Sequence, residues 1–341
     1  MLRIMIVTNS LTGGGAERSM NLIANELWGR GISVALVPIN DGSPDEVMPA
    51  CEILPLQRIW PGGLLDTLNS FRKFNKLVRL WRPSHIILNC DLPELFGALL
   101  LRKIPLVVVE HSSSPWNTRK KVGILVRFLL KKKAVTWIAV SSHLTIWPNH
   151  EKPEFVIQNP IQNIKDDLAI VPSQTIQRLI FIGRLSKEKQ PDWLLEITRK
   201  TRIKTEIIGD GLLRSELEKE ATRIHLPVNF YGQQIKPWAH TKPGDLLIIP
   251  SSYEGDGLVL VEAMLHKCPV LLSDIPDLRR FQLPDQHYCR TVEDFVASIN
   301  LFKENLTELV VPPDYCSGIL GLRTLDKIGD LWEIALNTRR N

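Results

Sequence analysis

Two glutamates eight positions apart, Glu254 and Glu262, stand in the most informative stretch of the chain. An apolar run over residues 245–250 predicts a buried strand, residues 251–257 a loop, and Leu258 onward a helix. A loop at a helix N-terminus presents backbone N–H groups that suit a phosphate. Carboxylates repel phosphate, but they are pure acceptors and suit hydroxyl groups. The pattern therefore predicts a ligand that carries phosphates and two sets of hydroxyls, as a nucleotide sugar does.

Two cations follow another predicted strand, at residues 178–183. Arg184 and Lys189 come shortly after Gly183. Cations placed at a diphosphate leaving group stabilise the charge that develops on it, arginine as a bidentate fork and lysine as a point charge. Taken alone, the two bases are more typical of a solvated loop.

Apolar periodicity alternates between strands and helices along the chain. The predicted strands lie at 2–8, 33–39, 85–88, 106–109, 137–140, 178–183, 204–208, 229–231, 246–250 and 269–273. The predicted helices lie at 16–28, 66–81, 93–102, 118–133, 191–201 and 212–224, from 258, from about 292, and at 324–336. This order predicts an α/β fold with two Rossmann-like, doubly wound domains.

The domain boundaries follow from a break in this pattern near residue 160. We expect a Rossmann-like domain over 1–160, a linker or hinge over 161–178, a second Rossmann-like domain over 179–322, and a helix in 323–341 that returns toward the first. A cleft between two such domains, outside the carboxyl ends of the strands, is the expected ligand site.

Composition and charge narrow the classes of protein. The 341 residues contain five scattered cysteines without CxxC spacing, which argues against a disulfide framework or a zinc site and favours a reducing cytoplasm. No apolar run reaches the roughly 18 residues of a membrane span, and the N-terminus does not resemble a signal peptide. Residues 1–160 hold 19 Lys and Arg against 12 Asp and Glu, whereas residues 161–341 hold 23 against 25. The basic first half predicts an anionic membrane or a nucleic acid as partner.

Short motifs complete the pattern, in a fixed order. They lie at 13–18, 110–112, 140–142, 158–160, 183–189, 208–211 and 231–232, and end with the pair Glu254-x7-Glu262. Together they resemble a retaining glycosyltransferase of the GT-B fold, in the large GT4-like family. The resemblance covers nearly the whole chain.

The resemblance assigns roles on the donor side. It implies that Glu254 holds hydroxyls of the donor sugar, that Glu262 holds the ribose hydroxyls, and that Arg184 and Lys189 clamp the diphosphate. The backbone between the glutamates would meet the sugar and phosphate through Gly255, Asp256, Gly257 and Leu258. An aromatic residue is common in the family where this chain has Asp256, so we expect Asp256 to influence the choice of donor.

Other residues are assigned with an alternative beside them. His111 ends a strand and resembles the family's histidine at the donor sugar near the reacting carbon, although a lone histidine is usually structural. The turn residues Gly209, Asp210, Gly211 and Tyr231 match positions that hold base and ribose, and a plain turn explains them equally well.

The loop of Gly13, Gly14 and Gly15 would border the donor phosphates and the acceptor, together with Glu17. Glu17 is equally typical of an acid at a helix N-terminus. A nicotinamide dinucleotide fold, with Asp41 on the ribose, is the competing interpretation, but the loop lacks GxGxxG.

Residues 119–133 hold seven bases and no acid. Basic amphipathic helices bind anionic membranes, at roughly 1 kcal/mol per base. Nucleic acid would explain the charge equally well, but we expect membrane and no nucleic acid, because glycosyltransferases often meet lipid-linked acceptors. The predicted membrane contacts are Lys120, Lys121, Arg127, Lys131, Lys132 and Lys133. The expected location is the cytoplasmic face of the plasma membrane.

The resemblance implies sugar transfer from a UDP- or GDP-linked donor to a lipid-linked or oligosaccharide acceptor. From the small size and the basic first domain we expect a role in bacterial O-antigen, capsule or exopolysaccharide assembly. The resemblance also implies front-side attack with retention, no metal, no cofactor, and hinge closure on donor binding. Two alternatives stay open, a nucleotide-sugar epimerase of the same fold and a non-catalytic sugar-binding subunit. The second should have lost Glu254 or Arg184, and the chain has both.

Overall fold

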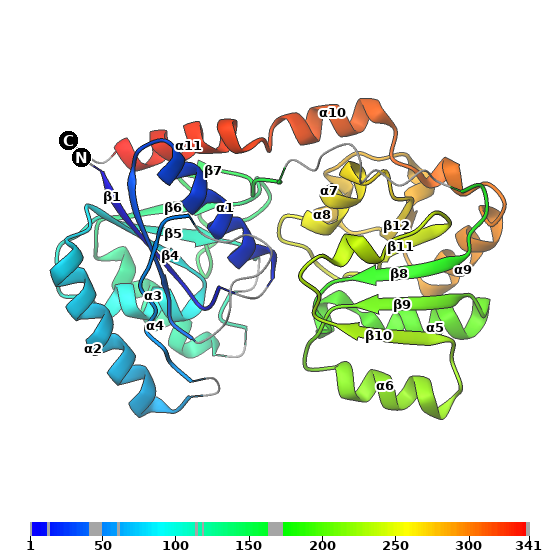
Figure 1. The fold of residues 1–341 in the computed structure, drawn as a ribbon, viewed down its shortest axis with the longest axis horizontal. Helices are drawn as coiled ribbons and strands as arrows, with labels where there is room; N and C mark the ends of the chain where they lie inside the picture. Colours follow the sequence, from blue (N-terminus) through cyan, green and yellow to red (C-terminus); the bar gives the residue numbers. More distant parts are fainter. Residues whose placement is uncertain are drawn as a thin grey trace. The chain divides into compact units, whose positions relative to one another are not determined.

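The computed structural model describes residues 2–11, 14–40, 50–59, 62–112, 115–117, 119–162 and 173–338. Internal contacts divide the chain into two compact units. Unit 1 comprises Met1–Gln162 with Arg323–Asn341, and unit 2 comprises Asn163–Leu322. Each unit is a parallel sheet with helices packed against it (Figure 1).

Unit 1 contains a seven-stranded sheet in the order β3-β2-β1-β4-β5-β6-β7. All its pairings are parallel. Its strands are β1 (Arg3–Thr8), β2 (Ser33–Pro38), β3 (Glu52–Ile53), β4 (His85–Asn89), β5 (Leu106–Glu110), β6 (Val135–Ala139) and β7 (Phe155–Val156). The central strands are almost continuous apolar runs, because a parallel sheet is covered on both faces.

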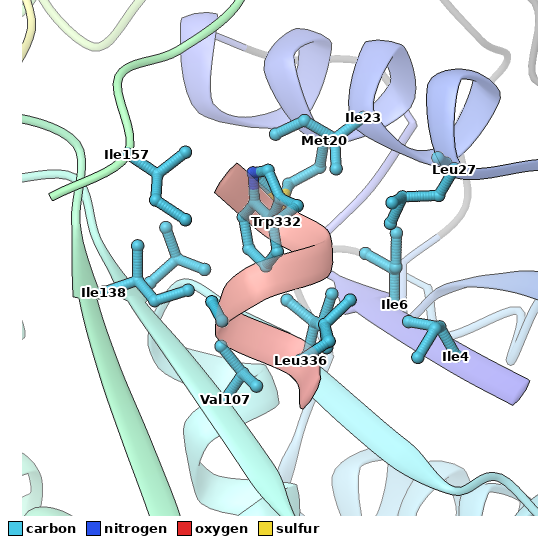
Figure 2. Close-up of a cluster of buried hydrophobic side chains, with 14 of the residues drawn as sticks. Ile4, Ile6, Met20, Ile23, Leu27, Val107, Ile138, Ile157, Trp332 and Leu336 are labelled. Atoms are coloured by element: carbon cyan, nitrogen blue, oxygen red, sulfur yellow. The ribbon is translucent and has the colours of Figure 1, made fainter. Parts of the chain in front are cut away.

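Five helices belong to unit 1 within its described residues. They are α1 (Gly15–Gly29), α2 (Leu64–Trp81), α3 (Asp91–Leu99), α4 (Lys120–Lys131) and α11 (Leu325–Asn337). Helix α11 packs against α1, and its Trp332 is buried in the same core as Met20 and Ile23 of α1 (Figure 2). A segment from beyond unit 2 thus completes the core of unit 1.

Unit 2 contains a six-stranded parallel sheet in the order β10-β9-β8-β11-β12-β13. Its strands are β8 (Arg178–Ile182), β9 (Lys204–Ile208), β10 (Val228–Gly232), β11 (Asp245–Ile249), β12 (Val270–Ser273) and β13 (Tyr288–Cys289). Its α-helices are α5 (Pro191–Thr201), α6 (Arg214–Arg223), α7 (Leu258–Leu265), α8 (Pro276–Arg279), α9 (Val292–Leu301) and α10 (Pro313–Gly321). Short 3-10 helices are η2 (Lys187–Lys189), η3 (Pro237–His240), η4 (Asp285–His287) and η5 (Leu306–Leu309).

The predicted fold class, α/β with two Rossmann-like units, is confirmed. Of the predicted linker 161–178, residues 163–172 lie outside the described residues, and Ile176 already packs in the core of unit 2. Among the described residues, no helix combines the length and apolarity that crossing a bilayer requires.

Each sheet reverses its direction of strand addition once. The reversal lies between β1 and β4 in unit 1 and between β8 and β11 in unit 2. In open α/β sheets, ligands bind outside the carboxyl ends of the strands at such a switch point. The loops after β1, β8 and β11 are therefore the places where the fold positions a site.

Candidate functional site

The switch point of unit 2 brings two predicted charges together. Strands β8 and β11 pair in parallel, so the loops after them leave the same edge of the sheet side by side. Lys189 ends η2 after β8, and Glu254 follows β11. The Lys189 Nζ and Glu254 Oε1 atoms lie 2.6 Å apart. Two residues that are 65 positions apart in the sequence thus form one ion pair at the predicted site.

Glu254 is held from several directions. The Ser251 hydroxyl donates to the same Oε1 atom at 2.7 Å, and the Glu254 backbone N–H donates to Asp277 Oδ2 at 2.8 Å. The side chain of Glu254 is 9 % exposed and that of Lys189 is 23 % exposed. The pair is therefore ordered but still open to solvent on the lysine side.

The loop after β11 is also tied to η2 through its backbone. The Ser252 N–H donates to the carbonyl oxygen of Glu188 at 2.8 Å, and its hydroxyl donates to the same oxygen at 3.1 Å. Arg184, by contrast, is exposed and forms no ion pair with any residue that the structure describes. The structure thus joins Lys189 to Glu254 and leaves the Arg184 guanidinium in solvent.

The glycine loop between the two glutamates is fixed by Arg280. Its Nη2 atom donates to the carbonyl oxygen of Asp256 at 2.8 Å and lies 3.4 Å from the Asp256 carboxylate. The side chain of Asp256 is buried, so its extra negative charge faces a cation. Gly257 adopts a left-handed conformation with φ of 61° where α7 begins, which favours glycine at this position.

Glu262 lies on α7 and is bound by a residue that the sequence reasoning missed. The indole Nε1 of Trp238 donates to Glu262 Oε2 at 2.8 Å. The indole ring stacks on His266, with ring centroids 4.5 Å apart and planes 13° apart. Because Trp238 stands 24 positions before Glu262, neither periodicity nor a local motif could have indicated this contact.

The glycines after β9 pack on the loop after β8. A Cβ atom at Gly209 would collide with the carbonyl oxygen of Gly183, and one at Gly211 with that of Leu185. Asp210 accepts from Arg214 Nη1 at 2.7 Å. These glycines therefore allow the loop after β9 to pack closely against the backbone of the loop after β8.

Tyr231, at the end of β10, is partly exposed and contacts His240, with ring centroids 4.8 Å apart. Its hydrogen bond with Glu206 raises the pKa of the phenol. The nucleotide-side candidates Tyr231 and Glu262 thus both contact residues of the short helix η3.

The candidates of unit 1 follow β1 and β5, which flank β4 in the sheet. His111 comes directly after β5 and is partly buried. Gly14 is the N-cap residue of α1, and its backbone N–H donates to Glu17 Oε2 at 3.1 Å. This contact fits the helix-acid interpretation of Glu17. Gly13 lies outside the described residues.

The prediction that Arg127 contacts a membrane is wrong. Arg127 points into unit 1 and its side chain is 1 % exposed. It forms ion pairs with Glu94 at 2.6 Å and with Glu110 at 2.5 Å, and Trp116 Nε1 donates to Glu94 at 2.9 Å. Burial raises the pKa of Glu110 to about 7, even though Arg127 opposes this shift. The sequence pattern misled because both acids lie outside the basic segment.

The remaining bases of α4 surround an apolar face that is turned outward. The residues Val122, Ile124, Leu125 and Phe128 are exposed, whereas Val126 and Leu130 are buried. Lys120, Lys121 and Lys132 are exposed, Lys131 pairs with Glu151 at 2.5 Å, and Lys133 is half-buried against the carbonyl oxygen of Leu100.

The described residues contain no cluster of three or more His, Cys, Asp or Glu side chains that could hold a metal ion.

Comparisons with known proteins agree on the class of enzyme. Residues 164–308 match the family model described as glycosyl transferases group 1, and residues 13–145 match that described as glycosyltransferase family 4. A relative from Campylobacter jejuni is 26 % identical over 301 residues, 84 % of this chain and 83 % of its own. It is a GalNAc-alpha-(1->4)-GalNAc-alpha-(1->3)-diNAcBac-PP-undecaprenol alpha-1,4-N-acetyl-D-galactosaminyltransferase.

Solved structures show the same fold. HepE from Anabaena, in complex with UDP and glucose, is 19 % identical with a TM-score of 0.76, over 99 % of this chain and all of that one. Sucrose-phosphate synthase from Thermosynechococcus elongatus is 15 % identical with a TM-score of 0.77, over 98 % of each chain. The two family models together span most of the chain and show that it belongs to the group 1 glycosyltransferases, a GT4-like family, and the solved structures show the GT-B fold.

Proposed function

We propose that this glycosyltransferase moves a sugar from a nucleoside-diphosphate sugar, UDP- or GDP-linked, to a lipid-linked or oligosaccharide acceptor with retention of anomeric configuration. The observation that carries the proposal is the Lys189–Glu254 ion pair at the switch point of unit 2. It supports the proposal because a cation that suits a diphosphate lies beside a carboxylate that suits sugar hydroxyls.

The donor would be bound by unit 2, with its diphosphate at Lys189 and at the exposed guanidinium of Arg184. Helix α7 begins at Leu258 and adds the N–H groups of its first turn. On donor binding, the ion pair between Lys189 and Glu254 would loosen. Lys189 would then contact the diphosphate, and Glu254 would accept from a hydroxyl of the donor sugar.

The chemical step transfers the glycosyl carbon between two oxygens. The bond from the anomeric carbon to the leaving phosphate oxygen breaks, and the acceptor hydroxyl oxygen forms a bond on the same face. The acceptor proton passes to the leaving phosphate. Lys189 and Arg184 stabilise the charge on the diphosphate, a contribution of about 3–4 kcal/mol for one well-placed donor. We propose that these cations make a metal unnecessary.

The acceptor would be bound by unit 1, with His111 near the reacting carbon and the loop of Gly14 and Gly15 beside it. The Campylobacter relative is named for an undecaprenol-PP-linked glycan, which supports a lipid-linked acceptor. A bacterial O-antigen, capsule or exopolysaccharide is the corresponding product.

The test is a mass-spectrometric screen of UDP- and GDP-sugars with an undecaprenol-PP-linked oligosaccharide as acceptor. Nucleoside diphosphate should be released only when donor and acceptor are both present, and NMR of the product should show the donor's anomeric configuration. EDTA should leave the rate unchanged. Epimerised nucleotide sugar without acceptor would identify an epimerase instead, and binding without turnover a non-catalytic subunit. An inverted product would refute front-side attack.

We also propose that α4 lies on an anionic membrane. Leu125 and Phe128 are 59 % and 55 % exposed, and the ammonium of Lys132 lies 4.4 Å from the centre of the Phe128 ring. An outward apolar face with basic flanks and no acid suits an anionic bilayer surface.

Flotation with vesicles of phosphatidylglycerol and phosphatidylethanolamine tests this proposal. The variant Leu125→Glu with Phe128→Glu should abolish co-flotation, and Lys120→Glu with Lys121→Glu should weaken it as salt does. The variant Arg199→Glu changes an exposed base of unit 2 and is the matched control. Flotation that survives both α4 variants would refute the membrane contact.

A further inference from the structure

The short helix η3 contacts two of the nucleotide-side candidates of unit 2, Glu262 and Tyr231. We propose that Trp238 is a positioning residue that orients Glu262 toward the ribose hydroxyls of a ribonucleoside diphosphate. This inference rests on the proposed function, because it presumes that Glu262 meets the ribose.

The indole of Trp238 contacts Glu262 on α7 and His266, the C-cap residue of the same helix. Glu262 and His266 are four positions apart, so their side chains lie one helical turn from each other on the same side. The indole N–H donates to Glu262 at 2.8 Å while the ring stacks on His266 at 4.5 Å. An indole N–H is a donor only, so it can hold a carboxylate but cannot replace it as the acceptor for a hydroxyl.

Trp238 is itself held by its own turn. Pro237 fixes the backbone at the first position of η3. The carbonyl oxygen of Trp238 accepts from the Thr241 hydroxyl at 2.6 Å and from the Thr241 N–H at 3.2 Å. At the end of the same helix, His240 contacts the Tyr231 ring. The helix therefore sets the positions of Glu262 and Tyr231 together.

The terminal torsion of a glutamate is broad, so each hydrogen bond to its carboxylate narrows the orientations that the carboxylate adopts. Two neighbouring ribose hydroxyls require their acceptor in one orientation. The N–H of Trp238 restricts that rotation through a charge-assisted hydrogen bond. Removal of this N–H should weaken the binding only of nucleotides that carry the ribose hydroxyls. Nucleotides without these hydroxyls do not depend on the orientation of Glu262.

The variant Trp238→Phe keeps an aromatic ring for His266 and removes the N–H. Calorimetry would measure the Kd of UDP, or of GDP where the wild-type chain binds GDP more tightly, and of the 2′-deoxy and 3′-deoxy forms. We expect Trp238→Phe to raise the Kd of the ribonucleotide by about 5- to 20-fold. This is less than the roughly 13- to 160-fold that corresponds to a whole hydrogen bond to a charged group, because the Glu262 carboxylate itself remains. The Kd of the deoxy forms should change by less than about twofold, and the donor KM should rise with kcat nearly unchanged.

Two further variants complete the test. Glu262→Ala should abolish the preference for ribonucleotides, and His266→Leu, which keeps the N–H but removes the stack, should reduce it partly. His266→Leu decides the question if Trp238→Phe does not fold. Trp193→Phe, a tryptophan on α5 that packs against Phe295, is the matched control and should change nothing.

The outcomes separate the two proposals. If Glu262→Ala leaves the ribose preference intact, the assigned role of Glu262 fails and with it part of the proposed function. If Glu262→Ala removes the preference but the variants of Trp238 and His266 retain it, or weaken all nucleotides equally, only the positioning role is overturned.

Discussion

Each unit has a cation and carboxylates near the carboxyl end of a strand, but the two arrangements differ in exposure. In unit 1, Arg127 and the two glutamates that bind it are 1–2 % exposed. In unit 2, Lys189 is 23 % exposed and Glu254 is 9 % exposed. A fully buried ion pair cannot release its partners without leaving a charge in an apolar interior, whereas a half-open pair can exchange one partner for a ligand. The buried Arg127 cluster therefore stabilises the fold of unit 1, whereas the half-open Lys189–Glu254 pair suits a binding site.

Neighbouring residues strengthen this contrast. Trp116 and the carbonyl oxygen of Trp147 occupy further hydrogen-bonding positions around the buried cluster. The lysine of the open pair has a solvated side, and Arg184 stands near it in the sequence without an ion pair to any described residue. An ion pair between a base and glutamate thus stabilises the fold in unit 1 and, as proposed, binds a ligand in unit 2.

The largest expected effect is on stability, from Arg127→Ala. The change leaves Glu94 and Glu110 buried without a cation and should lower the free energy of unfolding by about 3–5 kcal/mol. Urea unfolding would measure the loss. Lys132→Ala, at the exposed C-cap of the same helix, should change this free energy by less than about 0.5 kcal/mol. A loss below about 1 kcal/mol for Arg127→Ala would contradict a structural role for the cluster.

The second effect is on activity, from Lys189→Ala. The value of kcat/KM should fall by about 100-fold or more, since a cation at the leaving group is lost. Thermal stability should change little, because the pair is partly solvated. Lys187→Ala, two positions earlier in η2, controls for charge. If Lys189→Ala instead destabilises the chain as much as Arg127→Ala, the two clusters do not differ as described.

The third effect is a pH dependence carried by Glu110. Its pKa is raised from 4.5 to about 7 in the folded chain, so the folded state keeps a proton that the unfolded state releases between these values. Stability should therefore fall as pH rises from about 4.5 to 7, by on the order of 3 kcal/mol. Glu110→Gln should flatten this slope in urea unfolding. Some slope should remain, because burial also raises the pKa of Asp91, to about 6. An unchanged slope would show that Glu110 does not titrate there.

The smallest effect concerns Asp256. The variant Asp256→Asn removes a negative charge near the proposed phosphate loop and leaves the charge of Arg280 in place. Donor KM should fall by about two- to fivefold, because Arg280 already offsets part of the repulsion between the Asp256 carboxylate and a phosphate. Steady-state kinetics with several nucleotide sugars would measure it, with Asp285→Asn as a control on an exposed ion pair with Arg279. A rise in KM would mean that the carboxylate assists donor binding.

The sequence predicted the fold class well because apolar runs in a parallel sheet are local and continuous. The helix predicted at 191–201 is α5, and the one predicted from Leu258 is α7. Short strands such as β3 and β7, two residues each, carry too little pattern to be found. Helix α10 was missed because its few apolar residues follow two prolines and show no clear stripe.

The partners of the site residues could not be predicted in the same way. Trp238, Asp277 and Arg280 reach their targets across loops, and no periodicity links them. Arg127 was misassigned because nothing in the basic segment distinguishes this buried arginine from the exposed and half-buried lysines around it. Contacts between residues that are distant in the sequence therefore decide which charges are structural, and sequence spacing alone does not reveal these contacts.

The chain runs from unit 1 into unit 2 and returns to unit 1, and this path has a consequence for synthesis on the ribosome. Unit 2 is continuous, whereas Trp332 joins the core of unit 1 only after every residue of unit 2 has been made. Domains generally fold as units while the chain emerges. The first 162 residues therefore leave part of their apolar core uncovered until α11 has been synthesised. Unit 1, which is synthesised first, is completed last.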